Sequence, residues 1–381
     1  MTLKASERSA IAPFYAMEVL RAANRRAAEG AHVLHLEVGE PGAGAPEPVL
    51  AAARAAIGRV RLGYTEALGT PALRARIARH YRDRYALAVD PARVAVTIGA
   101  SGAFLLAFLA AFDVGDRVAV AEPCYPAYRN ILSALGIEVV ALQAGPEHRF
   151  QPTVELLDQA GPLDGLVVAS PSNPTGTMLA PDQLARLAGW CEAHGVRLIS
   201  DEIYHGITYG MAESCALAHS ERALVVNSFS KYFAMTGWRL GWMVMSEDVA
   251  GAVDRLAQNL FVSPAALPQH AALVAFDCRD QLDAYVAGYA RNRKMLLERL
   301  PEAGFDRLAP ADGAFYLYAD VSRLANDSQE LCARMLDEIG VAATPGVDFD
   351  PRRGHRYVRF SFAGGEAEIA AAAERIVAWR P

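Results

Sequence analysis

The feature that most constrains the fold is a series of short apolar runs that alternate with helical stretches between residues 93 and 245. Continuously apolar runs of this length are typical of parallel strands covered on both faces. Their alternation with Ala- and Leu-rich helical segments indicates βαβ units and therefore an α/β fold. We expect a seven-stranded, mostly parallel sheet with strands at residues 93–98, 118–121, 139–142, 166–169, 196–200, 223–226 and 242–245.

The two ends of the chain have a different sequence pattern, in which short strands are mixed with helices. A helix is expected within residues 5–30, followed by a short alternating strand at 33–38, and a long helical stretch covers 267–300. Beyond it, the alternating runs 314–318 and 357–362 lie among helices at 327–340 and 366–379. Such a mixture of short strands and helices is typical of a small α+β domain.

Composition, net charge and cysteine spacing exclude several classes of function for this chain. The chain has 381 residues, of which 52% are hydrophobic and 21% charged, as in a well-buried globular enzyme. Its net charge of −6 argues against nucleic acid as a partner, because backbone binding needs an excess of Lys and Arg. The five cysteines are widely spaced, no signal core opens the chain, and the longest apolar run, 103–112, is too short to span a bilayer. We therefore expect reduced thiols, no membrane and a cytoplasmic location.

The strongest chemical signal is the stretch from Ser228 to Trp242, which begins just past the predicted strand 223–226. Open α/β sheets bind ligands at the carboxyl ends of their strands. Lys231 in a desolvated crevice could lose its proton and attack a carbonyl. Ser228, Ser230 and Arg239 beside it would suit a phosphate. The common cofactor that is both an aldehyde and a phosphate ester is pyridoxal 5′-phosphate.

This stretch closely resembles the lysine motif of the class I/II aminotransferases, which belong to fold type I of the pyridoxal-phosphate enzymes. The resemblance extends over roughly residues 10–380 and is most specific from 99 to 242. It implies that Lys231 forms the Schiff base with the cofactor and that no metal is needed. It also implies a large cofactor-binding domain at 45–290, a small domain made of 1–44 and 291–381, and a homodimer.

Two segments are expected at the cofactor. Ala100, Ser101 and Gly102 follow the first core strand and open a helix, whose N-terminal N–H groups form a ready phosphate cradle. After the second strand, Tyr125 matches the family position that stacks on the pyridine ring. Tyr128 is the competing aromatic residue for that role.

Two further motifs follow later strands. In Ser170–Gly176, the resemblance implies that Asn173 hydrogen-bonds the phenolic oxygen of the cofactor and helps to bind the substrate. A carboxylate facing the pyridine nitrogen would keep it protonated, and Asp201 takes that role. Tyr204 resembles the family tyrosine that also donates to the phenolic oxygen. Glu202 is the alternative acid, but alternation along a strand directs it to the opposite face.

The resemblance assigns three more residues outside the core of the sheet. Gly39, in a Gly-Glu-Pro segment, is expected to pass over the substrate. Tyr64 is expected to reach the cofactor phosphate of the partner subunit. Arg359, in an alternating strand, would bind the α-carboxylate of the substrate, since a buried arginine needs a carboxylate partner. Arg356 is its rival, with an offset that puts it on the other face.

The implied activity is ping-pong transfer of an amino group from an L-amino acid to a 2-oxo acid, with Lys231 as general base and acid. A β-elimination C–S lyase or a decarboxylase of the same fold would use the same residues and stays open. The region 257–263 contains no arginine for a distal carboxylate, although Arg255 is close. Neutral or aromatic donors are therefore favoured over aspartate, and the acceptor is 2-oxoglutarate or pyruvate.

Overall fold

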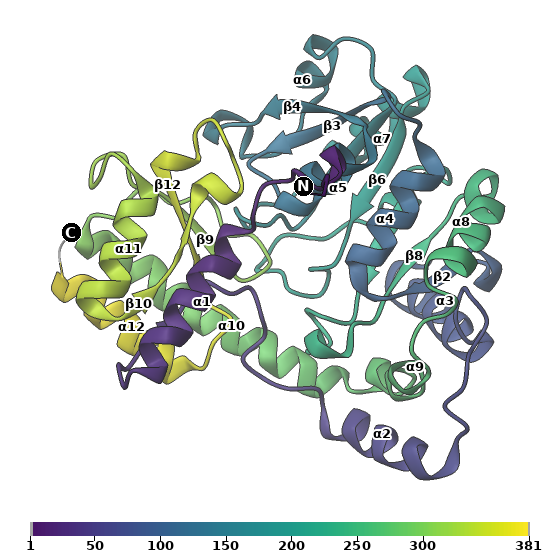
Figure 1. Ribbon diagram of the computed structural model, residues 1–381, viewed down its shortest axis with the longest axis horizontal. Coiled ribbons are helices and arrows are strands. Elements are labelled where there is room, and N and C mark those ends of the chain that lie inside the picture. Colours follow the sequence, from purple (N-terminus) through teal and green to yellow (C-terminus); the bar gives the residue numbers. More distant parts are fainter. Residues whose placement is uncertain (1–2, 380–381) are drawn as a thin grey trace.

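The computed structural model describes residues 3–379, and its main element is a seven-stranded sheet (Figure 1). The strand order is β2-β8-β7-β6-β5-β3-β4, and only β8 runs antiparallel to its neighbours. This confirms the expected mostly parallel α/β sheet. The strands are β2 (Val94–Thr97), β3 (Arg117–Glu122), β4 (Glu138–Gln143), β5 (Gly165–Ala169), β6 (Arg197–Asp201), β7 (Leu224–Ser228) and β8 (Gly241–Val244).

Successive strand residues lie in two separate apolar clusters, one on each face of the sheet. Val225 belongs to one cluster and Val226 to the other, as expected when side chains alternate along a strand. Both faces are buried, which explains why the strands are apolar at nearly every position. On one side α4 (Gly99–Ala111), α5 (Pro126–Leu135) and α8 (Glu247–Leu260) contribute to the cluster, and on the other side α3 (Pro71–Tyr85) and α7 (Pro181–His194) do so.

The antiparallel strand β8 determines which loops meet at one edge of the sheet. The parallel strands β3, β5, β6 and β7 end at their common carboxyl edge. Because β8 runs in the opposite direction, the residues that precede it lie at this same edge. The segment from Lys231 to Arg239 connects β7 to β8, so it lies along this carboxyl edge of the sheet. One short segment thus brings both cationic side chains to the strand ends.

A second region is built on a three-stranded antiparallel sheet, β11-β12-β9. Arg359 on β12 pairs with Tyr318 on β9 and with Thr344 on β11. The first helix packs beside this sheet, at the left in Figure 1, and Asp348 accepts hydrogen bonds from the first N–H groups of that helix. The elements of this region are α1 (Tyr15–Ala28), β1 (Leu34–His35), β9 (Tyr316–Asp320), α11 (Ser328–Ile339), β10 (Val341–Ala342), β11 (Thr344–Pro345), β12 (Tyr357–Ser361) and α12 (Glu366–Trp379).

Two predicted elements differ from the structure. The single helix expected over 267–300 is divided into α9 (Ala266–Ala272) and α10 (Arg279–Arg299). The break lets Phe276 pack against the rings of Phe229 and Phe233, a contact that an unbroken helical pattern does not reveal. The strand expected over 33–38 is reduced to the two residues of β1, which pair with β10. The remaining helices are α2 (Glu47–Arg59) and α6 (Val154–Gln159).

Two simpler expectations can also be compared with the structure. The five cysteines form no disulfide bonds with one another in the structure. Within residues 3–379, no helix is long and apolar enough to cross a membrane.

Candidate active site

A cavity of about 180 Å³ opens at the carboxyl edge of the large sheet, where that edge faces β9 and β12. Most of the residues singled out from the sequence line it together. They are Gly39, Ala100, Ser101, Tyr125, Asn173, Asp201, Tyr204, Ser228, Ser230, Lys231, Arg239 and Arg359.

Two predicted site residues do not line this cavity. Gly102 lies one step further into α4, where a Cβ would come within 2.8 Å of the Ile98 side chain. Tyr64 is 89% exposed, in the segment between α2 and α3. A role for Tyr64 therefore needs a second molecule.

Lys231 lies at the centre of the cavity wall. Its Nζ donates a hydrogen bond to the Gly39 carbonyl oxygen at 2.6 Å. Burial, together with the positive charge of Arg359, lowers the pKa of Lys231 to about 8. At neutral pH roughly a tenth of the molecules therefore carry an uncharged amine. Such an amine can act as a nucleophile and can move a proton.

One end of the cavity is suited to an anion. The first turn of α4 presents unpaired backbone N–H groups there, and Arg239 lies against it. A Cβ on Gly99 would approach Arg239 Nη2 to 2.6 Å, so glycine leaves the room that the guanidinium occupies. The hydroxyls of Ser228 and Ser230 are 2.9 Å apart beside it. Hydroxyls, N–H groups and an arginine make a set of donors typical of phosphate sites.

Asp201 is a buried acidic residue of the cavity wall and is 3% exposed; Glu37, the other acidic lining residue, is paired with His35. Burial raises the pKa of Asp201 to about 6, although the Tyr128 hydroxyl and the Ile203 N–H both donate to it. The group is therefore ionised near pH 7 and can face a cationic ring nitrogen. Both Tyr125 and Tyr128 line the cavity with their rings edge-on to each other, and Tyr128 also supports the carboxylate.

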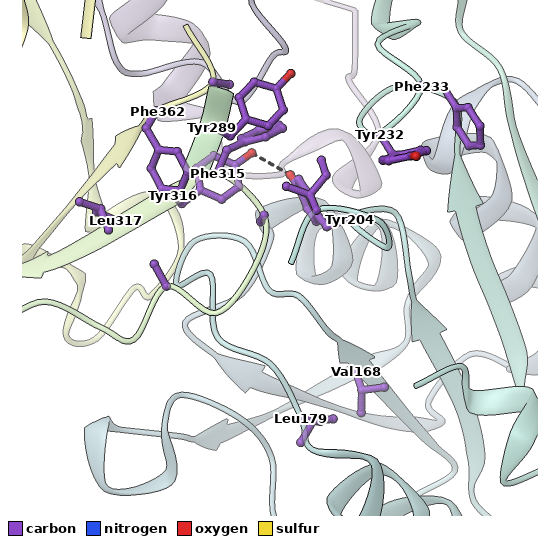
Figure 2. Close-up of a cluster of buried hydrophobic side chains, with 14 of the residues drawn as sticks. Val168, Leu179, Tyr204, Tyr232, Phe233, Tyr289, Phe315, Tyr316, Leu317 and Phe362 are labelled. Atoms are coloured by element: carbon purple, nitrogen blue, oxygen red, sulfur yellow. Dashed lines mark hydrogen bonds between the residues drawn. The ribbon is translucent and has the colours of Figure 1, made fainter. Parts of the chain in front are cut away.

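A pair of tyrosines joins the two sheets across the cavity (Figure 2). The hydroxyls of Tyr204, after β6, and Tyr316, on β9, are 2.7 Å apart. Burial raises the pKa of Tyr204 well above its ordinary value, so the hydroxyl keeps its proton and can donate. A Cβ on Gly39 would overlap the Tyr316 hydroxyl, which explains a glycine at that position.

Arg359 is buried in the cavity wall with neutral partners only. It donates to Asn173 Oδ1 at 2.8 Å, to the Glu37 carbonyl oxygen and to the Thr344 hydroxyl at 3.2 Å. No carboxylate within residues 3–379 forms an ion pair with it, and its Nε has no hydrogen-bond acceptor within that range. A buried charge without a counterion is costly, so the site is suited to a carboxylate from a ligand.

Two of the alternatives weighed from the sequence lie away from the cavity. Glu202 points away from the cavity and accepts hydrogen bonds from Ser200 and the Ala216 N–H, as strand alternation predicted. Arg356 has a half-exposed side chain and contacts Asp320 at 3.5 Å. Neither lines the cavity.

Sequence reasoning missed how three residues serve the site. Tyr128 was weighed only as a ring-stacking residue, and the contact of Tyr316 with Tyr204 was not expected. Thr344, which helps to hold Arg359, carried no sequence signal. Tyr128 lies three residues after Tyr125, so both fall on one face of a helix and could have been considered together.

Several of the remaining lining residues are apolar, although Glu37 and Thr236 also line the cavity. Phe14, Ala16 and Met17 come from the start of α1, and Phe104 from α4. Arg239 and Arg359 are the arginines among the lining residues, and Arg255 is not one of them.

Comparisons with known proteins agree with this geometry. Residues 31–376 match the family described as aminotransferase class I and II. A valine–pyruvate aminotransferase from Mycobacterium tuberculosis is 52% identical over 386 residues, covering 100% of both chains. The crystal structure of an aminotransferase from the same species superposes with a TM-score of 0.98 at 52% identity, with 100% of both chains covered. Aspartate aminotransferase from Thermus thermophilus with maleate gives 0.93 at 33% identity, covering 99% of this chain and 100% of that one.

Proposed function

The chain belongs to the class I and II aminotransferases, and we propose that it transfers the amino group of a neutral L-amino acid to a 2-oxo acid such as pyruvate. Transfer of an amino group between an amino acid and a 2-oxo acid is the activity of this family. Pyridoxal 5′-phosphate is the general cofactor of the family, and we assign its site in this chain to the cavity around Lys231.

The residues of the cavity fit this cofactor from end to end. The donors at the start of α4 and the Arg239 guanidinium suit its phosphate. Asp201, ionised near neutral pH, suits the pyridine nitrogen, and Tyr125 offers an aromatic face. Asn173 and Tyr204 suit the phenolic oxygen. Gly99 supports the fit, because any side chain there would displace Arg239.

When bound, the cofactor withdraws electrons from the Cα of the substrate. The chain's own residues do the rest. Lys231, with a pKa of about 8, would take the proton from the substrate Cα and would return it to the C4′ carbon of the cofactor. Asp201 would stabilise the positive charge of the ring nitrogen, and the Tyr204 hydroxyl would donate a hydrogen bond to the phenolic oxygen. The low dielectric of the buried site strengthens each of these interactions.

The observation that carries the proposal is the unneutralised Arg359 in the same cavity as a lysine of lowered pKa. A carboxylate bound to Arg359 would neutralise this charge and would align an α-amino acid beside Lys231. The apolar side chains of Phe14, Met17 and Phe104 favour a neutral side chain on that substrate. The name of the valine–pyruvate relative supports the same choice.

We also assign a homodimer in which Tyr64 reaches the phosphate site of the partner subunit. Tyr64 is 89% exposed, and Leu62 and Val262 beside it are 42% and 53% exposed. The two segments are joined by a hydrogen bond from the Thr65 N–H to the Ser263 hydroxyl at 3.3 Å. Exposed apolar groups around a tyrosine suit a subunit interface. Each subunit would consist of a large domain at 45–290 and a small domain formed by 1–44 and 291–381.

The first test is an absorbance spectrum of the enzyme with pyridoxal phosphate, before and after an amino-acid pool is added without any 2-oxo acid. Conversion of a visible band to a near-ultraviolet band supports the proposal, and Lys231→Ala should abolish catalysis of this conversion. Accumulation of pyruvate and ammonia with a persistent band would instead identify an eliminating lyase.

Substrate choice is tested separately with a panel of amino donors. Valine, alanine and aromatic donors should give higher kcat/KM values than aspartate. If aspartate leads by about tenfold or more, the assignment of a neutral donor is wrong.

A further inference from the structure

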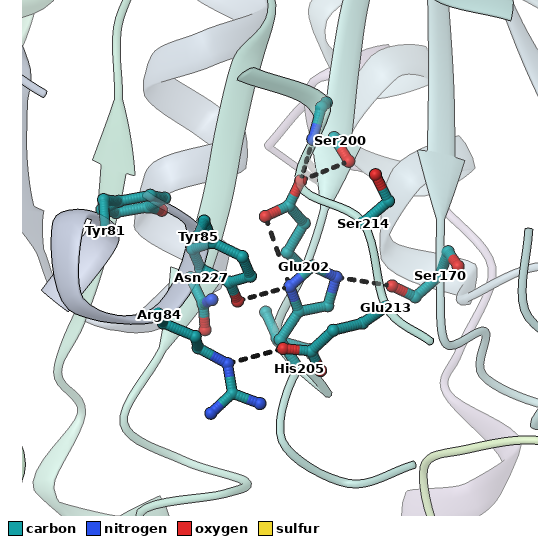
Figure 3. Close-up of polar contacts among 12 residues, drawn as sticks. Tyr81, Arg84, Tyr85, Ser170, Ser200, Glu202, His205, Glu213, Ser214 and Asn227 are labelled. Carbon is teal, nitrogen blue, oxygen red and sulfur yellow. Dashed lines mark hydrogen bonds and ion pairs between the residues drawn. The ribbon is translucent and has the colours of Figure 1, made fainter. Parts of the chain in front are cut away.

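A buried polar cluster surrounds the turn after β6 (Figure 3), and its residues do not line the cavity. It contains Tyr85 from the end of α3, Glu202 and His205 from the turn after β6, and the carbonyl of Ser170 after β5. The side chains of Glu202 and His205 are 1% and 2% exposed. None of these residues has a role in the mechanism derived above.

We propose that His205 is a positioning residue of the aminotransferase site, because its imidazole fixes the loop that carries Asn173 against the turn that carries Asp201 and Tyr204. His205 directly follows Tyr204 in sequence, and Ser170 precedes Asn173 by three residues. The inference rests on the site residues assigned under the proposed function.

The imidazole donates to a backbone carbonyl that lies just past the paired part of strands β5 and β6. The last paired residues of β5 and β6 are Ala169 and Asp201. Glu202 then turns away and donates its N–H to the Val226 carbonyl oxygen at 2.8 Å. The Ser170 carbonyl oxygen, beyond the end of the ladder, is hydrogen-bonded by His205 Nε2 at 3.1 Å. A buried carbonyl needs such a donor.

The other ring nitrogen is held just as closely. Since the Ser170 oxygen can only accept, Nε2 carries the hydrogen. In the neutral ring Nδ1 then accepts from the Tyr85 hydroxyl, 2.7 Å away, and Glu202 Oε2 is 3.5 Å from the same nitrogen. Hydrogen bonds on both nitrogens fix the tautomer and the ring orientation, as for the supported histidines of many active sites.

Two substrate-facing groups depend on this tether. Asn173 accepts from Arg359, and the Tyr204 hydroxyl bonds that of Tyr316. Asn173 and Tyr204 lie on different loops. The hydrogen bond from His205 to the Ser170 carbonyl oxygen joins these loops, and neither of these two residues lines the cavity. A displacement of about 1 Å between them would cost up to about a hundredfold in rate.

The test compares three substitutions of His205 in the holoenzyme. His205→Leu removes both hydrogen bonds, and His205→Asn has an amide too short to span from Tyr85 to Ser170. His205→Gln can still donate to the carbonyl and accept from the tyrosine. His80→Leu is the control for loss of a neighbouring imidazole, because His80 is half-buried among aromatic rings that include Tyr85, makes no hydrogen bond to Ser170 and does not line the cavity.

We expect kcat/KM to fall about tenfold or more in the Leu and Asn variants, and most of this loss to be restored in the Gln variant. The second measurement is the pH midpoint of the visible absorbance band of the enzyme with bound pyridoxal phosphate. Displaced donors stabilise the anionic phenolic oxygen less, so the midpoint should rise by more than about 0.5 unit in the Leu and Asn variants. The Gln and His80→Leu proteins should keep the wild-type midpoint.

The inference is overturned if the Leu and Asn variants keep the wild-type midpoint, or if His80→Leu moves it as far. If His205→Leu does not fold, the Asn and Gln pair decides, since both are uncharged amides that differ in reach. Equal behaviour of that pair would also overturn it. A wild-type protein without a visible band or transamination would instead refute the proposed function.

Discussion

Asp201, the last residue of β6, and Glu202, which follows it, face different surroundings. Asp201 faces the cavity, where a tyrosine and one N–H are its partners. Glu202 faces the buried cluster, where Ser200, the Ala216 N–H and His205 surround it. Burial raises the pKa of both carboxyls. The difference is that the cavity face holds groups suited to a ligand, whereas the Glu202 carboxylate is enclosed by protein groups that hydrogen-bond its Oε1 and leave Oε2 3.5 Å from His205 Nδ1.

The largest effect should come from the centre of the cavity face. Lys231→Ala removes the amine that takes and returns the proton, so kcat should fall by at least about 10³-fold. Single-turnover kinetics with an amino donor measure this loss. The matched control is Lys294→Ala, because Lys294 is exposed on α10 with only a loose contact to Glu298 at 3.9 Å. A comparable loss in the control would show that general damage, rather than the chemistry, is being measured.

Neutralising Asp201 should mainly reduce activity, whereas neutralising Glu202 should mainly reduce stability. Asp201→Asn should lower kcat about 10²- to 10³-fold, because the ring nitrogen loses its counterion. Glu202→Gln should leave kcat within about tenfold of wild type and should cost about 1 kcal/mol of stability through its disturbed hydrogen bonds. Equal losses of activity in the two variants would contradict the distinction between the faces.

In the protein without cofactor, Asp201 should make the free energy of unfolding depend on pH. The folded pKa of Asp201, about 6, lies above its ordinary value, so the unfolded chain releases this proton first as pH rises. The carboxyl therefore lowers the free energy of unfolding as pH rises from about 4 to 6, by about 2–3 kcal/mol in total. Asp201→Asn should be more stable than wild type at pH 7 and similar to it below pH 4. Urea titrations at both pH values measure this difference.

The two arginines of one strand region extend the comparison. Arg359→Gln removes the carboxylate-binding group of the cavity, so kcat/KM for the amino donor should fall about 10²-fold, mostly through KM. Arg356→Gln loses only a loose, half-exposed contact and should change stability by less than about 0.5 kcal/mol. Loss of donor binding in the Arg356 variant would reverse the assignment.

The smallest effect is expected at the contact between the two sheets. Tyr316→Phe removes the hydroxyl that bonds Tyr204 and nothing else, which is worth about 1 kcal/mol. Activity should fall about fivefold. A loss as large as that of Asp201→Asn would mean that Tyr316 itself touches the reacting atoms.

The sequence predicted the parts of the molecule that follow local rules. All seven strands of the large sheet were expected, because both faces are buried and the runs are apolar throughout. Strand alternation correctly separated Asp201 from Glu202. The long helix at 267–300 was wrong at its centre, since the break depends on the packing of Phe276 among residues distant in sequence.

The contacts that support the site could not be predicted in the same way. Tyr128 reaches Asp201 across 73 residues, and Tyr204 meets Tyr316 across 112. Both contacts depend on how separate elements pack, which no local pattern encodes. The resemblance to a family named the residues that would touch the ligand, but it did not reveal what holds them in place.

The neutral partners of Arg359 have a practical consequence for assay chemistry. A guanidinium that forms no ion pair with a carboxylate of residues 3–379 should accept small carboxylates from solution, including acetate, formate or citrate from a buffer. Such buffers should compete with the amino acid and inflate its apparent KM, while a sulfonate or amine buffer of the same pH should interfere less. The choice of counterion in the assay is therefore itself a probe of how this arginine is held.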